Sequence, residues 1–109
     1  LGGVKGGTGN DLGAPLRIGG DVKAPILKER VEPVYPEAAR KARMQGVVIL
    51  EAIITAEGNV ADVKVLKSIN PLLDSAAERA VSRWAYKPAT LNGRAVSVYL
   101  TVTVNFQLH

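Results

Sequence analysis

The sequence has 109 residues, of which 47% are hydrophobic and 5% aromatic, so it predicts one domain with a modest aliphatic core. It contains no cysteine and a single histidine, the terminal His109, which excludes disulfides, thiolate metal sites and a histidine-based catalytic centre. The net charge of +4 is scattered along the sequence, which favours a mildly basic surface over a nucleic-acid or anionic-lipid patch.

Membrane spans and signal peptides are absent from this sequence. No apolar run approaches the roughly 20 residues needed to cross a bilayer. Because the sequence begins at Leu1 rather than Met, we expect it to be part of a longer chain. Any membrane anchor would then lie outside these residues.

Three segments can be distinguished by composition. Residues 1–20 hold eight of the eleven glycines, and we interpret residues 1–14 as a flexible linker. Residues 15–34 contain three prolines that favour extended chain, so they predict an arm before a folded domain at 35–109. The apolar residues that could hold this arm against the domain are Leu16, Ile18, Ile26 and Leu27.

The first predicted helix begins at Tyr35-Pro36. Proline suits the first helical turn, where its missing N–H costs nothing, and Gly46 is expected at the C′ position. Three basic residues lie toward the C-terminal end of the helix: Arg40, Lys41 and Arg43. A solvated helix face explains them more simply than contact with an acidic partner.

Two strands follow, joined by a hairpin. Residues 47–55 are apolar on both faces, which predicts a central strand covered on both sides. Gly58 supplies the positive φ of the turn, and residues 60–67 form the return strand. This second strand carries the charges of a protected sheet edge: Asp62, Lys64 and Lys67.

The second predicted helix begins with Asn70 as N-cap and Pro71 in the first turn. Its apolar stripe recurs at helical spacing and comprises Leu73, Ala77, Ala80, Val81 and Trp84. The helix ends before Pro88. We interpret Tyr35, Trp84 and Tyr86 as core anchors, with the Tyr86 hydroxyl able to reach the surface.

The last strand, residues 96–108, alternates apolar and polar residues throughout and carries no charge. If 47–55 is central, this strand pairs with it and lies on an edge that, unlike that of 60–67, is bare. The predicted fold is α+β, with the element order αββαβ. It comprises a three-stranded antiparallel sheet of order 2-1-3 with two helices on one face, preceded by the extended arm.

Several segments resemble the C-terminal domain of the TonB family of energy transducers. The matching segments are PVYP (33–36), RMQGVV (43–48), EGNV (57–60), VLKS (65–68), PLLD (71–74) and WAYKP (84–88). The Tyr-Pro and Trp-x-Tyr-x-Pro elements at this separation are specific only in combination. The motif residues are Tyr35, Pro36, Gly46, Gly58, Trp84, Tyr86 and Pro88.

The resemblance implies a non-enzymatic periplasmic domain of a protein anchored in the inner membrane by a segment absent from this sequence. Such a domain binds the Ton box of outer-membrane TonB-dependent receptors as an added β-strand and transmits energy derived from the proton-motive force. ExbB and ExbD would act through regions outside this sequence. The residues matching the receiving edge are Ser97, Val98, Tyr99, Leu100, Thr101, Val102 and Thr103, with flanking contacts at Glu32, Pro33, Arg40 and Arg43.

Other functions are weighed against this one. The same edge could pair with a second copy in a homodimer, or the domain could be a TolA-like or other envelope scaffold. A single-stranded RNA-binding sheet is less favoured, because the strands offer only Tyr99 and Phe106 for stacking. We expect no catalytic residue, metal or cofactor, and no nucleic-acid partner. Glu51 is interpreted as a strand-edge or solvated carboxylate rather than an inward-facing general acid.

Overall fold

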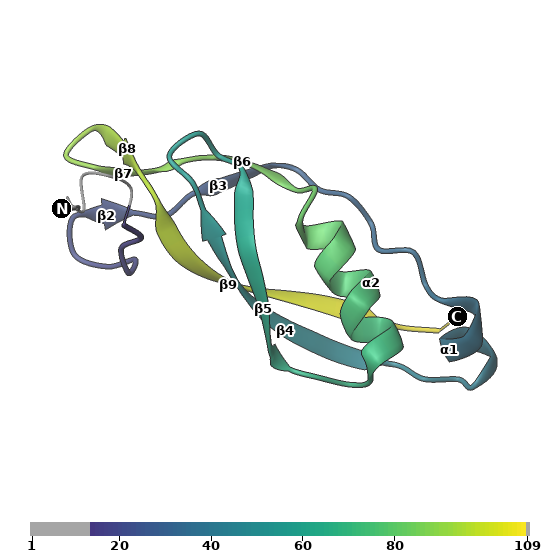
Figure 1. Ribbon diagram of the computed structural model, residues 1–109. Coiled ribbons are helices and arrows are strands. Elements are labelled where there is room, and N and C mark those ends of the chain that lie inside the picture. Colours follow the sequence, from purple (N-terminus) through teal and green to yellow (C-terminus); the bar gives the residue numbers. More distant parts are fainter. Residues whose placement is uncertain (1–13, 109) are drawn as a thin grey trace, which may run out of the picture.

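The computed structural model of the protein describes residues 14–108 and has the α+β fold predicted from the sequence, with two helices and several antiparallel strands (Figure 1). The strands are β2 (Val22–Lys23), β3 (Ile26–Glu29), β4 (Gly46–Ile54), β5 (Val60–Lys67), β6 (Ala85–Lys87), β7 (Ala89–Leu91), β8 (Arg94–Val96) and β9 (Val98–Phe106). The helices are α1 (Glu37–Lys41) and α2 (Pro71–Val81). Apart from Ala14, the predicted glycine-rich linker lies outside the described residues. Neither helix within 14–108 is long and apolar enough to cross a membrane.

The largest sheet has three strands in the order β5–β4–β9, all antiparallel. Strand β4 pairs along its whole length with β9, from Gly46 opposite Phe106 to Ile54 opposite Val98. Its pairing with β5 is interrupted by two register shifts, one of which includes Asp62 in the left-handed region with φ 47°. Strand β9 is therefore the edge that is paired without interruption, and β5 the irregular one.

One face of this sheet carries the core. Alternate residues of β4, from Val48 to Ile54, are buried there against α2, whose Leu73 and Val81 are fully buried. The helix begins as predicted: the Asn70 side chain accepts a 3.0 Å hydrogen bond from the backbone N–H of Leu73. Small residues of α2 let its backbone approach the sheet closely.

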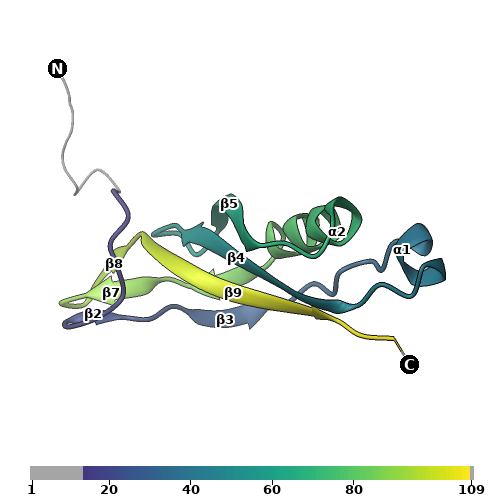
Figure 2. The same ribbon diagram turned by 90° about the horizontal axis from the view of Figure 1, so that it is seen from below.

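The predicted arm is built into the domain by strand pairing. Strand β2 pairs antiparallel with β7, and β3 pairs antiparallel with β6. Both views place β2, β7 and β8 together at one end of the molecule, and α1 with the C-terminal end of β9 at the other (Figure 1, Figure 2). The segments 22–29 and 85–96 thus extend the fold beyond the five elements that the sequence pattern predicts.

The three aromatic anchors occupy the core as expected. Trp84 and Tyr86 are each 6% exposed, and the half-buried Tyr35 meets Phe106 edge to face at 5.4 Å between ring centroids. The Tyr35 hydroxyl donates a hydrogen bond to the carbonyl oxygen of Met44. Tyr86 differs from the expectation in one respect, because its side chain is buried and does not reach the surface. This burial raises the pKa of its hydroxyl.

Helix α1 is shorter than predicted. It ends at Lys41, and Ala42 caps it. The left-handed conformation that was expected at Gly46 falls instead at Arg43, with φ 56°. Gly46 already belongs to β4, with φ 145°, and a β-carbon there would meet the Ile69 side chain at 3.1 Å. The helix ends early because the chain must turn to reach the start of the central strand.

The two-sided apolar pattern of 47–55 was read as a strand covered on both faces, and this is wrong. The face opposite the core is open: Val47 is 39% exposed, and Ile49, Glu51 and Ile53 are only half-buried. The helices and the strands β6 and β7 contribute their buried residues to the other face. A strand can therefore be central in its sheet while one side remains accessible.

The long strand predicted for 96–108 is two strands. Residues Arg94–Val96 form β8 and pair with β7 across a turn in which Asn92 and Gly93 both have positive φ, 52° and 81°. Ser97, expected on the wet face, is instead 8% exposed at the break before β9 begins. The strand β9 is therefore nine residues long, because Val96 belongs to β8 and residues 107 and 108 lie beyond the end of β9.

The second helix ends before Trp84, which was predicted to lie on its apolar stripe. Helix α2 ends at Val81, and the chain turns through Ser82 and Arg83 into β6. Trp84 reaches the core from this turn, with its indole N–H bonded to the arm at Val31. Residues 85–87, where the predicted helix was expected to end, form a strand instead because the arm offers β3 as a partner.

Candidate functional site

The backbone of β9 presents its polar groups alternately to β4 and to the opposite edge. The Tyr99 N–H donates a 3.0 Å bond away from β4, to the carbonyl oxygen of Leu16. Because the N–H and C=O of one strand residue point to the same side and alternate along the strand, those of Thr101, Thr103 and Asn105 face the same edge. Within 14–108, no backbone hydrogen bond to these three residues is found on that side.

The seven residues predicted to receive a partner strand lie along one edge. Ser97 is buried at its start, and the side chains of the other six divide into two sets. Val98 and Val102 are buried in the core, and Leu100 packs against it. The side chains on the open face are those of Tyr99, Thr101 and Thr103. An added strand would contact mainly the second set, whereas the first set holds the edge in place.

The first part of this edge is already occupied by the chain itself. Leu16 forms an isolated parallel bridge with Val98. Its N–H donates a 2.9 Å bond to the carbonyl oxygen of Ser97, and its carbonyl accepts the bond from Tyr99. The sequence predicted that Leu16 would lie against the domain, but it contained no signal for this particular edge.

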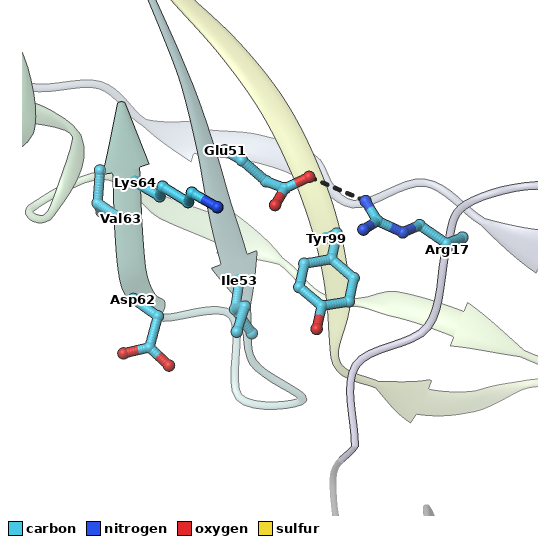
Figure 3. A pocket seen from close by; sticks show the side chains of 7 residues that line it. All are labelled: Arg17, Glu51, Ile53, Asp62, Val63, Lys64 and Tyr99. Carbon is cyan, nitrogen blue, oxygen red and sulfur yellow. Dashed lines mark hydrogen bonds and ion pairs between the residues drawn. The ribbon is translucent and has the colours of Figure 1, made fainter. Parts of the chain in front are cut away.

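A pocket on the open face adjoins this bridge (Figure 3). It is lined by Arg17, Glu51, Ile53, Asp62, Val63, Lys64 and Tyr99. The guanidinium of Arg17 lies 4.1 Å from the centroid of the Tyr99 ring and 2.9 Å from a carboxylate oxygen of Glu51. Glu51, interpreted from the sequence as a strand-edge or solvated carboxylate, lies on the open face, opposite Lys64 of β5 in the strand register.

Arg17 was not singled out by the sequence analysis. Its partner Glu51 lies 34 residues away in the sequence. The two side chains meet only because the arm crosses β9. Only the general expectation of an apolar arm pointed toward this region. A lone arginine beside an isoleucine and a leucine has no pattern that would identify its partner.

The four flanking residues lie away from the Leu16 bridge. Glu32 pairs with Arg30 at 3.4 Å and is 77% exposed in its side chain, and Pro33 is half-buried. Arg40 and Arg43 are exposed on and just after α1, which lies near the C-terminal end of β9 (Figure 1). Contact of these four residues with a bound strand stays a prediction.

The described residues give no support to metal or stacking chemistry at this edge. Within 14–108 there is no group of three His, Asp or Glu side chains that could hold a metal ion. Phe106, one of the two aromatic residues considered for base stacking, is 2% exposed in the core. Tyr99 is available on the open face, but Arg17 already covers its ring.

The fold and this edge define a small α+β domain in which an antiparallel sheet ends in a regularly paired, uncharged strand. Residues 31–108 match the family described as Gram-negative bacterial TonB protein C-terminal. The chain belongs to this family. The sequence resemblance is therefore confirmed over the segment in which its motifs occur.

Curated relatives and a solved structure agree with this assignment. The chain is 39% identical over 101 residues to Protein TonB of Xanthomonas campestris, covering 92% of this chain and 42% of that protein. It is 31% identical over 87 residues to Protein TonB of Vibrio cholerae, covering 79% and 36%. The solution structure of the Pseudomonas aeruginosa TonB C-terminal domain superimposes with a TM-score of 0.66 at 27% identity, covering 82% and 88%. The chain thus spans less than half the length of these curated relatives.

Proposed function

We propose that this domain binds the Ton box of outer-membrane TonB-dependent receptors as an additional strand on the edge of β9. The observation that carries the proposal is the row of outward-facing backbone groups at Thr101, Thr103 and Asn105, next to a place where the edge already accepts a strand residue, Leu16. Strand addition uses such groups for affinity and the neighbouring side chains for specificity.

The expected affinity follows from the number of new hydrogen bonds. Thr101 and Thr103 offer two N–H and two C=O groups, and Asn105 extends the row. Four to six bonds at about 1 kcal/mol each amount to roughly 4–6 kcal/mol before the cost of ordering the peptide. Binding through the backbone alone is thus weak, and side-chain contacts on the open face are needed for micromolar affinity. Weak binding suits a component that must grip and release its partner.

The wider role is proposed for the longer protein of which this domain would be part. We infer a non-enzymatic energy transducer for active uptake. Its domain lies in the periplasm, and its anchor in the inner membrane. Force derived from the proton gradient would reach it through ExbB and ExbD, which act on regions outside this chain. The similarity to TonB C-terminal domains supports this inference.

Self-pairing is the second candidate use of the edge. The residues of β9 from Val98 to Phe106 carry no charge, and charges are a common device against edge-to-edge association. A homodimer joined through two β9 strands would use the same backbone groups as a receptor peptide. The two uses would compete, so increasing protein concentration would lower the apparent peptide affinity.

Amide-shift mapping with a panel of receptor N-terminal peptides tests the proposal. Binding should shift the amides of 99–105 more than those of β5, and a scrambled peptide of equal composition should not. Peptide shifts confined to β5 or α2 would contradict the proposal. Binding of phage- or colicin-type domains, with no response to any Ton-box peptide, would favour the TolA-like scaffold.

A further inference from the structure

The edge of β9 has one half occupied by the chain's own arm and one half open. We propose that the segment Leu16–Ile18 is an internal competitor that a partner strand must displace from the first half of this edge. This inference rests on the proposed function, because it concerns the same edge. It makes the availability of the site depend on the arm.

The competition follows from backbone groups that cannot be shared. Leu16 engages the carbonyl of Ser97 and the N–H of Tyr99 at 2.9 and 3.0 Å. A strand paired along 97–103 would need the same two groups. Neighbouring strands lie about 4.8 Å apart, so the arm and a partner strand would also occupy the same space.

Side-chain contacts hold the arm at this position without locking it. Arg17 stacks on Tyr99 and pairs with Glu51, but its side chain is 73% exposed. Exposed ion pairs and cation–π contacts of this kind are individually weak. Leu16 adds apolar contact with the core cluster. Such a segment is held well enough to compete, yet weakly enough to be released.

The arm leaves the edge immediately after Arg17. Ile18 is 38% exposed, and the chain turns at Gly19 and Gly20, where the Val22 N–H bonds the Gly19 carbonyl at 3.0 Å. Both glycines have positive φ, and a β-carbon on either would meet nothing within 4 Å. After this turn β2 is secured by its pairing with β7. Residues 14–18 can therefore separate from β9 while the rest of the arm stays in place.

This geometry gives an order of events. A partner strand first pairs with the open half at 101–105, where no displacement is needed. Extending the pairing toward Ser97 then removes Leu16 and frees Arg17 from Tyr99 and Glu51. The apparent dissociation constant is the intrinsic one divided by the fraction of molecules in which the site is open, so an arm docked in about nine-tenths of molecules weakens binding about tenfold.

Two substitutions release the arm by different routes. Arg17→Ala removes the ion pair and the stacking contact, and Leu16→Pro removes the N–H that bonds Ser97. Lys23→Ala is the matched control, because it removes one exposed positive charge from β2, which pairs with β7 and not with β9. The probe is one synthetic Ton-box peptide, titrated into the full 109-residue chain by NMR, with amide hydrogen exchange of Tyr99 measured in the free protein.

We expect Arg17→Ala and Leu16→Pro to tighten peptide binding by about three- to tenfold and to speed Tyr99 exchange, with Lys23→Ala like the original chain. Peptide binding of equal strength in all four proteins would overturn the competition while leaving the proposed function intact. Failure of every protein to bind any Ton-box peptide at 97–105 would overturn both. If Leu16→Pro unfolds the domain, Arg17→Ala alone decides the result.

Discussion

The indole Nε1 of Trp84 donates a 2.8 Å hydrogen bond to the carbonyl oxygen of Val31, which lies 53 residues earlier in the chain. This bond joins the turn after α2 to the arm, and the Arg30 guanidinium lies 5.3 Å from the indole ring centroid on the same segment. Trp84 is 6% exposed, so water cannot easily take the place of the indole N–H as the partner of the Val31 carbonyl oxygen.

Replacing Trp84 by Phe should therefore lower the free energy of unfolding by about 1–3 kcal/mol, since the Val31 carbonyl loses its partner and the core loses volume. Urea denaturation followed by circular dichroism measures the change. Arg30→Ala is the comparison, because it removes only exposed contacts, the stacking on Trp84 and the ion pair with Glu32, and should cost less than about 1 kcal/mol. An equal cost for both variants would show that the hydrogen bond contributes little.

Gly58 should not tolerate a side chain. It is buried in the hairpin between β4 and β5, with φ 89°. Its carbonyl oxygen accepts a 2.9 Å hydrogen bond from the Tyr86 N–H. A β-carbon at this position would overlap the Tyr86 carbonyl oxygen. Gly58→Ala should lower the free energy of unfolding by about 3 kcal/mol or more, because the alanine would adopt a strained φ and the backbone at Tyr86 would also have to move. Gly93→Ala, at φ 81° with nothing within 4 Å, should cost only about 1–2 kcal/mol.

Thermal denaturation of both glycine variants measures this difference. Equal midpoints would mean that the strain of a positive φ, rather than the contact between the hairpin and β6, limits substitution at Gly58. A lower midpoint for Gly93→Ala would contradict the packing argument outright.

Tyr86 gives a prediction for alkaline pH. Burial raises the pKa of its hydroxyl above the ordinary value of 10.0. Above about pH 10 the unfolded chain loses this proton while the folded chain retains it, so the unfolded state binds fewer protons and stability falls as pH rises. Below pH 10 both states are protonated, and the group contributes no pH dependence.

Tyr86→Phe removes the hydroxyl and with it this contribution to the pH dependence of stability. The difference in unfolding free energy between the original chain and the variant should shift in favour of the variant as the pH rises from about 8 to about 11. Urea titrations at constant ionic strength measure it. If the free energy of unfolding fell equally in both proteins as the pH rises, groups other than Tyr86 would be responsible for the fall.

The receiving edge can be tested with a single backbone donor. Thr101→Pro removes an N–H that faces away from β4, so it should abolish peptide binding while the helices persist in the circular dichroism spectrum. Thr101→Val keeps the N–H and the strand propensity and should bind the peptide within about threefold of the original chain. Unchanged peptide affinity in Thr101→Pro, followed by NMR shifts, would show that the edge is not the binding site.

Local chemistry explains which features the sequence could predict. Asn70 and Pro71 favour the start of a helix, because the cap and the missing N–H act within one turn. Asn92-Gly93 makes a tight turn for the same local reason. The alternation of 98–106 predicts a strand with one buried face, and the structure has β9 with Val98, Val102, Val104 and Phe106 buried.

Periodicity was less informative where two partners could compete for the same residues. The run from Val96 to Leu108 alternates without interruption, yet it divides at Ser97 because β8 pairs with β7 and β9 pairs with β4. Val47, Ile49 and Ile53 are apolar, but nothing in their spacing indicates that their face stays open. Both errors concern neighbours that are distant in sequence.

The sequence by itself determined the N-cap of α2, the hairpin turns, the alternation of β9 and the family, because each depends on contacts within a few residues or on motifs read directly. Only the tertiary structure decided that the arm joins the fold through β2 and β3, and that Leu16 and Arg17 lie on the edge of β9. Those contacts join residues 34 to 83 positions apart, and their free energy depends on which surfaces the folded core leaves exposed.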